Sequence, residues 1–244
     1  MTPPPSDTSL FALWVYLAAS PLLWLTVTVG VFLVAQRLAK AARYHPLVNP
    51  VLISVVLVAS ILAITRTEYR TYFAGAQFVH FLLGPATVAL AIPLYRNRAL
   101  VRSALLPIVA ALLIGAPVAI LSAVAVARLM GAPAGITLAL SSKSVTAGIA
   151  MGVAQQIGAD PTLAAVFVIC TGIFGAVTVT PLMNLFRIKD FAARGFAAGL
   201  ASHGIGTARA FQVDGVAGAF AGLAMALNGL ATALLAPVII HWMK

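Results

Sequence analysis

Long apolar stretches are the feature that most constrains the fold of this chain. They follow one another between short polar breaks: Leu10–Gln36, Pro50–Thr65, Phe73–Tyr95, Ser103–Ala127, Gly131–Ile157, Thr162–Phe186, the weakly apolar Phe191–Phe211, and Val216–Trp242. A helix of about 20 apolar residues is long enough to cross a bilayer. The sequence therefore predicts an all-α polytopic membrane protein, a helical bundle in which residues 1–244 form one integral membrane domain.

The composition excludes several other classes of protein. Hydrophobic residues make up 62% of the chain and charged residues 8%, whereas soluble proteins carry about 25% charged residues. The net charge of +10 comes from basic residues scattered between apolar stretches, so we expect no nucleic-acid partner. The single cysteine, Cys170, lies inside an apolar run, so neither a disulfide nor a metal site is expected, and no motif indicates a cofactor.

The N-terminal residues "MTPPPSDTSL" lack the basic start of a signal peptide. The first apolar stretch is therefore predicted to be a retained helix, and the plasma (inner) membrane of a prokaryote is the expected location. Arg37, Lys40 and Arg43 follow this stretch. Because basic loops face the cytoplasm in most membrane proteins, the N-terminus is expected outside.

Two further basic groups lie at residues 96–102 and 187–194, with three apolar stretches between them. If all three crossed as simple helices, the two groups would lie on opposite sides of the membrane, against the positive-inside rule. One stretch should therefore fail to cross once, by re-entering or by splitting into two crossings. Gly131–Ile157 is the strongest candidate, because its centre is the least apolar.

Three breaks interrupt the expected helices, at Gly84-Pro85, Ser141–Ser144 and Ser202–Gly206. Non-helical backbone is tolerated inside a membrane where it is buried or lines a cavity. Broken helices can also point their positive N-terminal ends at an anion. "TVALAI" (Thr87–Ile92) and "TAGIAM" (Thr146–Met151) are weakly alike, which fits an inverted repeat of the transporter type, although such short matches also arise by chance.

The stretch "LALSSKSVTAGIA" places Lys143 among the hydroxyl groups of Ser141, Ser142, Ser144 and Thr146. A lysine at the centre of a spanning helix costs about 2.5–3.5 kcal/mol on insertion scales. One interpretation is a cation in a polar cavity, where the hydroxyl groups support an opened backbone and a bound anion. The alternative is a loop at the membrane surface, from which the lysine reaches water.

The stretch "GLASHGIGTARAF" contains His203, Gly204, Gly206, Thr207 and Arg209. The glycines let the backbone approach a ligand closely. Arg209 could hold a carboxylate through two parallel hydrogen bonds, and His203 could couple proton movement. The alternative is a packed contact between helices, in which the histidine bonds to a neighbour.

The remaining polar groups do not indicate an enzyme. Asn228 is expected to bond one helix to another. The sequence contains no carboxylate pair within a span and no HExxH zinc motif. A Ser–Lys dyad at Lys143 would use adjacent serines, whose side chains point in different directions on a regular helix.

Four segments carry a resemblance to a known family: "FLLGPATVALAIPLYRN", "LSSKSVTAGIAMGVA", "AAVFVICTGIFGAV" and "RIKDFAARGFAAGLASHGIGTARAFQ". Over about residues 36–244 the chain resembles the LrgB/CidB family. "TAGIAMGVA" departs from the family pattern near Gly148 and Gly152, where a Pro or Thr and an acidic residue would be expected. The motif positions carried onto this chain are Gly84, Pro85, Thr87, Lys143, Ser144, Thr146, His203, Gly204, Gly206, Thr207 and Arg209.

The resemblance implies two functions. Bacterial members of the family are described as holin-like or antiholin-like proteins that modulate murein hydrolase activity and cell lysis. They are usually paired with a small LrgA/CidA-like membrane protein. A similar domain forms part of the plastid glycolate/glycerate translocator, and bacterial members are implicated in pyruvate movement.

We favour a transporter of small monocarboxylates of the pyruvate, glycolate, lactate or glycerate class. A holin acts by lateral assembly, which does not require buried cations, whereas a carboxylate carrier does. The anion is expected at broken-helix ends near Lys143 and Arg209, with proton coupling through His203. The other expected binding residues are Ser142, Ser144, Thr146, Thr87, Gly204, Gly206 and Thr207. The alternative is a holin-like or antiholin-like regulator, and a homodimer in the lipid bilayer is the expected assembly.

Overall fold

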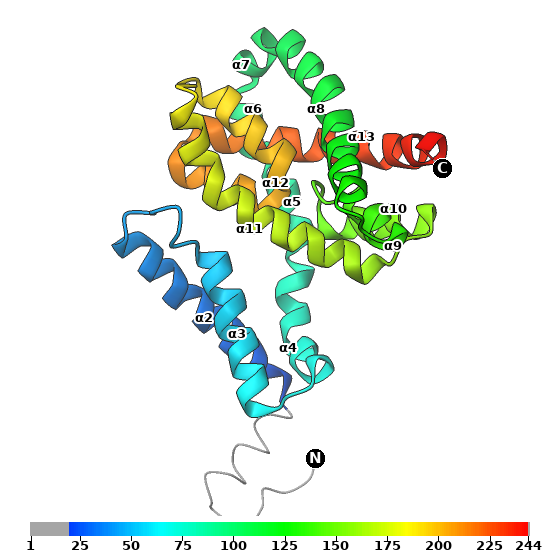
Figure 1. Ribbon diagram of the computed structural model, residues 1–244. Helices are drawn as coiled ribbons and strands as arrows, with labels where there is room; N and C mark the ends of the chain where they lie inside the picture. Colours follow the sequence, from blue (N-terminus) through cyan, green and yellow to red (C-terminus); the bar gives the residue numbers. More distant parts are fainter. Residues whose placement is uncertain (1–19, 244) are drawn as a thin grey trace, which may run out of the picture. The chain divides into compact units, whose positions relative to one another are not determined.

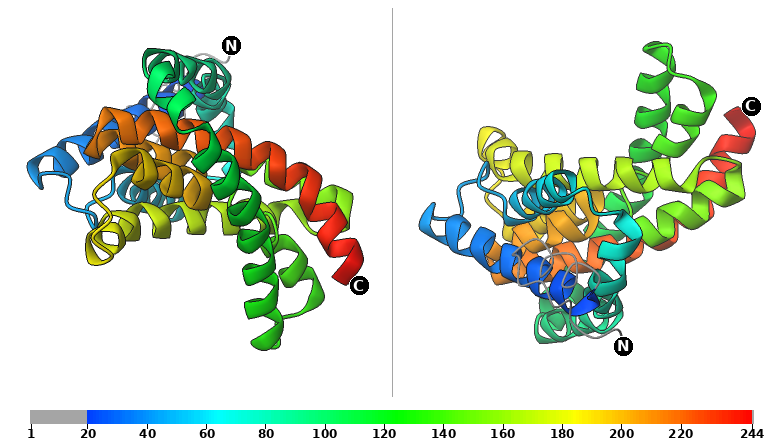
Figure 2. Two further views of the ribbon diagram at one scale, coloured as in Figure 1. Left: turned by 90° about the horizontal axis from the view of Figure 1, so that it is seen from above. Right: turned by 90° about the horizontal axis from the view of Figure 1, so that it is seen from below.

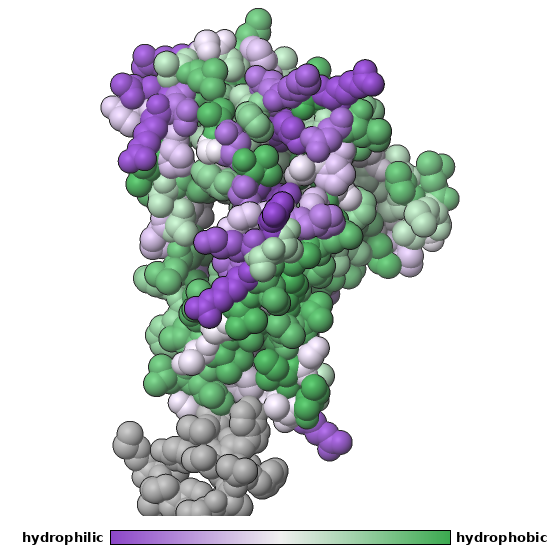
Figure 3. All heavy atoms as spheres, turned by 90° about the vertical axis from the view of Figure 1, so that its left-hand side faces the viewer, coloured by the Kyte–Doolittle hydropathy of each residue, from purple (hydrophilic) through white to green (hydrophobic). Residues whose placement is uncertain are grey.

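The computed structural model describes residues 20–243, and this part of the chain is helical without strands. Within it, five helices are long and apolar enough to cross a membrane. Many large apolar side chains are exposed, and apolar residues cover much of the surface seen in Figure 3. The prediction of an all-α membrane protein is therefore confirmed. The chain divides into two compact units, which meet in sequence between Ala89 and Leu90.

The first unit contains four of the described helices. They are α2 (Pro21–Ala41), α3 (Pro50–Thr65), α4 (Tyr69–Phe81) and α5 (Leu83–Ala89). Trp24 of α2 is fully buried, and its ring meets the ring of Tyr72 edge-on at 5.9 Å. The first expected span began at Leu10, and its residues before Ser20 lie outside the described part.

The break expected at Gly84-Pro85 is displaced in the structure. Both residues are helical, within α5, and the chain leaves the regular helix at Leu82 instead. Proline has no N–H, so Pro85 cannot bond to the carbonyl group one turn earlier, at Phe81. The helix is therefore interrupted one turn before the residues that cause the interruption.

Within residues 90–243, the second unit contains four long helices and four shorter ones (Figure 1). They are α6 (Ala91–Arg96), α7 (Arg98–Ser103), α8 (Leu105–Leu129), α9 (Ala134–Leu140), α10 (Ala147–Ile157), α11 (Pro161–Leu185), α12 (Phe191–Val213) and α13 (Gly215–Met243). Aspartates cap the starts of the last three. For example, Asp160 accepts a hydrogen bond from the N–H of Leu163 at 2.8 Å. Such caps fix where each helix begins.

Helix α12 is folded back on itself. Ser202 and His203 have non-helical backbone angles, with φ of 43° at His203. A Cβ atom at Gly206 would lie 2.6 Å from the carbonyl oxygen of Ala198, although residues eight apart in a straight helix are separated by about 12 Å. Residues 191–201 and 204–213 are therefore the two arms of a hairpin.

Contacts with α13 show the direction of these two arms. Gly195 of the first arm packs against Ala217, and Phe211 of the second arm packs against Gly218. Residues near opposite ends of α12 thus meet adjacent residues of α13, close to its start. The α12 hairpin therefore enters and leaves at the same end of α13.

Helices α9 and α10 also form a hairpin, around the loop Ser141–Thr146. Because it comes earlier in the chain, we call it the first hairpin and the α12 hairpin the second. Its core partners lie on the C-terminal half of α8, the N-terminal half of α11 and the C-terminal half of α13: Ile120, Val124, Ala164, Val168, Ala236 and Ile240. The arms of α12 pack instead with Ile108, Val179 and Phe220, in the opposite halves of these helices. Figures 1 and 2 show the two hairpins beside opposite halves of α13.

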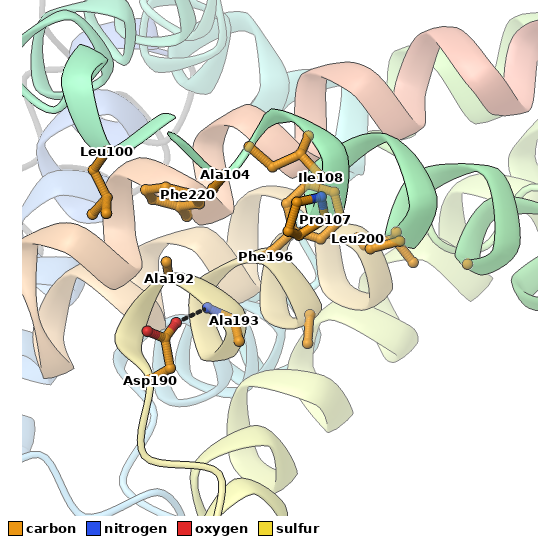
Figure 4. A pocket seen from close by; sticks show the side chains of 13 residues that line it. Leu100, Ala104, Pro107, Ile108, Asp190, Ala192, Ala193, Phe196, Leu200 and Phe220 are labelled. Atoms are coloured by element: carbon orange, nitrogen blue, oxygen red, sulfur yellow. Dashed lines mark hydrogen bonds between the residues drawn. The ribbon is translucent and has the colours of Figure 1, made fainter. Parts of the chain in front are cut away.

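A pocket at one end of the second unit locates the basic loops. Leu100 and Asp190 line the same pocket (Figure 4). Leu100 lies two residues before Arg102, and Asp190 directly follows Lys189. The start of α8 and the end of α11 therefore lie at one end of the unit, and the segment between α8 and α11 begins and ends at the other. The structure thus agrees with the expectation that Gly131–Ile157 fails to cross, because this segment re-enters.

Candidate functional site

The tips of the two hairpins meet at a polar site, which we call the central junction. It consists of the loop Ser141–Thr146, the turn Ser202–His203, and Asn228. Asn228 lies near the middle of α13, and the turn packs against Gly172 and Gly175, in the middle of α11. The junction is therefore about halfway along two helices that are long enough to span a membrane.

Asn228 joins the two hairpins. Its side chain is fully buried, and Nδ2 donates to the carbonyl oxygen of Leu200 at 2.9 Å and to that of Ser144 at 3.3 Å. Oδ1 accepts a hydrogen bond from Thr232 at 3.4 Å. One amide group thus bonds to both hairpins near their tips, so the two tips lie close together. The sequence analysis expected a helix-to-helix bond from Asn228 but did not place this residue in the site.

The loop of the first hairpin carries Lys143. Its Nζ donates to Ser144 Oγ at 3.1 Å, and its side chain is partly buried. The fully buried Ser142 hydroxyl lies 3.5 Å from the carbonyl oxygens of Ala139 and Ala150, one in each arm. Through Ser144, this loop lies beside Asn228 in the middle of α13, away from both ends of that helix.

Thr146 is the residue before α10, and its side chain makes no capping bond there. The first N–H groups of a helix have no partner within the helix and carry partial positive charge. The N-terminal end of α10 therefore adds positive potential at the junction. The second arm of α12 also begins at the junction, at Gly204. Two helix starts and one lysine thus converge on the same site.

His203 forms the tip of the second hairpin and is buried. Its φ of 43° is uncommon for a residue other than glycine. Its Nε2 lies 2.9 Å from the carbonyl oxygen of Val168, and because a carbonyl only accepts, Nε2 carries the hydrogen. A Cβ atom at Gly172 would lie 2.6 Å from the Cε1 atom of this imidazole ring. The ring therefore fits against α11 because Gly172 has no side chain.

The other expected residues of the α12 motif have different surroundings. The Thr207 hydroxyl is buried and donates to the carbonyl oxygen of His203 at 2.8 Å. Gly206 packs against the opposite arm, whereas a Cβ atom at Gly204 would meet only the Met225 sulfur, at 3.8 Å. Gly204 is therefore the glycine at which the backbone is most open to a ligand.

Arg209 lies six residues beyond the tip, which is about 9 Å along a helix. It is buried, donates to Gln212 Oε1 at 3.3 Å and lines a small cleft together with Arg194. Thr87 belongs to the first unit, where it is exposed and donates to the carbonyl oxygen of Leu83 at 2.7 Å. The structure thus gathers the Lys143 and His203 motifs at the junction and places Arg209 farther down the second hairpin.

The ionisable side chains of the junction are Lys143 and His203. Among residues 20–243, no group of three or more His, Cys, Asp or Glu side chains is placed to hold a metal ion. The arrangement can therefore bind an anion through an ammonium group, hydroxyl groups and backbone N–H groups.

Two opposed hairpins that meet between helices long and apolar enough to span a membrane define the class, a polytopic membrane protein. The sequence profile of the LrgB-like family matches residues 28–242, so the chain belongs to this family. No solved structure gives a significant match.

Three relatives illustrate the family membership. Uncharacterized protein YwbG of Bacillus subtilis is 33% identical over 220 residues, which cover 90% of this chain and 97% of the relative. Holin-like protein CidB of Staphylococcus aureus is 30% identical, over 90% of this chain and 95% of its own length. Holin-like protein CidB of Staphylococcus epidermidis is 29% identical, over 89% and 95% respectively. These names fit the holin-like alternative better than the carboxylate transporter.

Proposed function

We propose that this protein binds small monocarboxylate anions at the central junction and carries them across the membrane. The observation that supports the proposal most directly is the position of Lys143. It lies at the tip of a re-entrant hairpin, where Asn228 holds this tip to the second hairpin. Discontinuous helices whose N-terminal ends face a site at mid-depth are the usual device by which secondary transporters bind anionic substrates.

The hydrogen-bond donors of the junction suit a small anion. Lys143 supplies one positive charge and an N–H donor, and Ser144 and Thr146 supply hydroxyl groups beside it. A carboxylate that accepts a charge-assisted bond from Lys143 would gain about 1.5–3 kcal/mol, or roughly 10- to 100-fold in affinity. The neighbouring hydroxyl groups could bond to a 2-oxo or 2-hydroxy group, which favours pyruvate, lactate, glycolate and glycerate.

A holin-like role is the second candidate, and the printed names of the staphylococcal relatives favour it. In that role the protein would assemble laterally and make or regulate large lesions that release murein hydrolases. A small LrgA/CidA-like membrane protein would be the expected partner, and a homodimer the expected assembly. Large lesions would pass solutes far larger than pyruvate, which separates the two functions experimentally.

Uptake by the purified protein in liposomes would test the proposal. Labelled pyruvate, lactate and glycolate should enter protein-containing liposomes faster than empty ones. Lys143→Ala should lower uptake at least tenfold at subsaturating substrate, because it removes the charged donor. Lys189→Ala is the matched control, since Lys189 is exposed in the loop before α12, and it should leave uptake unchanged.

The same liposomes would test the holin-like alternative when they are loaded with a large fluorescent dextran. Dextran release would favour that alternative. A folded, monodisperse protein that transports none of the acids above background would refute the carrier proposal. Arg209→Ala, measured in parallel, would show whether the cleft beside the second arm also contributes to binding.

A further inference from the structure

The acidic residues of the second unit all lie away from Lys143. Within residues 90–243 they are Asp160, Asp190 and Asp214, and each accepts a hydrogen bond from a backbone N–H in the first turn of a helix. These positions are the ends of α11, α12 and α13, whereas Lys143 lies beside the middle of α13. No carboxylate of this unit is therefore placed to neutralise an ammonium group at the junction.

His203 is poorly placed to carry a transported proton. Its Nε2–H already bonds to the carbonyl oxygen of Val168, and the ring is held against Gly172. A second proton, on Nδ1, would place a positive charge at the junction, where no carboxylate of this unit lies to offset it. The geometry therefore gives His203 a structural role, in which it fixes the α12 hairpin to α11.

The other ionisable groups on the packed elements do not take this role either. Arg209 and Arg194 lie on the arms of α12, away from its tip. Cys170 of α11 is exposed, and Arg128 and His241 lie near the ends of α8 and α13. Lys143 is thus the ionisable group at the junction whose charge has to change or be offset when the substrate leaves.

We propose that Lys143 takes up one proton together with each bound anion, so that the protein moves a small monocarboxylate and a proton as a neutral pair. The empty site holds a neutral amine, which bonds to Ser144. A proton from the open side converts the amine to an ammonium group, which pairs with the carboxylate. On the other side the anion leaves, and the proton follows it into water. This inference rests on the proposed carrier function.

Net charge at the junction explains why the pair should move together. A lone ammonium group in an apolar environment is costly, and so is a lone carboxylate. The pair has no net charge. The loaded site can therefore switch from facing one side of the membrane to facing the other without moving charge across it. A dicarboxylate would leave one negative charge unpaired, so monocarboxylates should be preferred.

The test uses the full chain in liposomes that contain a pH-sensitive dye and labelled pyruvate outside. In the wild-type protein, about one proton should enter per pyruvate, and uptake should not respond to a valinomycin-set membrane potential. Lys143→Arg keeps a permanent charge at the site. It should still exchange external for internal pyruvate, yet net uptake should fall at least tenfold and proton entry should stop.

His203→Gln provides the discriminating variant, because a glutamine amide can still donate to the Val168 carbonyl. Even if its uptake is slower, it should keep about one proton per pyruvate, and Lys189→Arg should behave as wild type. If His203→Gln retained pyruvate uptake but lost proton entry, proton uptake would belong to His203, and the inference would be overturned. Proton entry with net uptake in Lys143→Arg would also overturn it.

The outcomes separate this inference from the carrier proposal. Wild-type uptake that is driven by potential and carries no proton would leave the carrier proposal intact and refute proton uptake by Lys143. No uptake and no exchange by folded wild-type protein would refute the carrier proposal itself. If Lys143→Arg is monodisperse but fails even to exchange pyruvate, the ratio of protons to pyruvate in the wild-type protein tests whether a proton enters with each anion.

Discussion

Gly172→Ala should destabilise the protein, because Gly172 leaves room for the imidazole ring of His203. The added Cβ atom would lie 2.6 Å from Cε1, 2.8 Å from Nε2 and 2.8 Å from Ile205 Cδ1. Carbon contacts this short do not occur in relaxed structures, so the ring would have to move. The ring cannot rotate away freely, since Nε2 bonds to Val168.

The expected size of this effect follows from three contributions. Overpacking in a well-packed region costs about 1–3 kcal/mol, and a lost hydrogen bond costs about 0.5–1.5 kcal/mol. Replacing a helical glycine by alanine returns about 0.5–1 kcal/mol. The net destabilisation should therefore be about 0.5–4 kcal/mol, with a central value of about 2 kcal/mol. For a chain of this size, 2 kcal/mol corresponds to a fall in Tm of roughly 4–8 °C.

Thermal denaturation of the purified protein in detergent would measure this change. Gly152→Ala is the matched control, because Gly152 lies on α10 with nothing within 4 Å of an added Cβ atom. It should keep or raise Tm, by the equivalent of up to about 1 kcal/mol. A Gly172→Ala protein as stable as Gly152→Ala would show that His203 does not pack where the structure places it.

Three further predictions concern the junction and its supports. Asn228→Ala should cost about 1–3 kcal/mol, because it removes the donor to the carbonyl groups of Ser144 and Leu200, whereas Thr232→Val should cost less than about 1 kcal/mol. Equal shifts in Tm would contradict the bridging role of Asn228. Asp190→Ala should cost about 1 kcal/mol and Asp190→Asn nearly nothing, since asparagine also caps helices. Succinate should inhibit pyruvate uptake far less than lactate does, and equal inhibition would argue against a site with a single ammonium group.

The long helices could be predicted because their apolar stretches are bounded by strong local signals. Asp160 and Pro161 mark the start of α11, and Asp214 marks the start of α13. The charge pattern of the loops also identified Gly131–Ile157 as a segment that does not cross simply. These features depend on neighbours in the sequence, so one sequence is enough to detect them.

The α12 hairpin was only partly visible in the sequence. The serine, histidine and glycines at its tip predicted a break, but a straight broken helix and a hairpin have the same composition. What distinguishes them is contact between residues far apart, such as Gly206 with Ala198. The role of Asn228 was missed for a similar reason, because a lone amide in an apolar span predicts a bond without naming its partner. Gly84-Pro85 predicted an interruption correctly but placed it one turn too late.

The central claim is that the two hairpins enter from opposite sides and meet at mid-depth. Single cysteines on a Cys170→Ser background, labelled by a membrane-impermeant maleimide in sealed vesicles, would test it most directly. Lys189→Cys and Val213→Cys, before and at the end of α12, should label from one side only. Ala134→Cys and Thr162→Cys, which flank the first hairpin, should label only from the other side. Labelling of Lys189→Cys and Val213→Cys from opposite sides would mean that α12 crosses the membrane as a single helix, and would contradict the account.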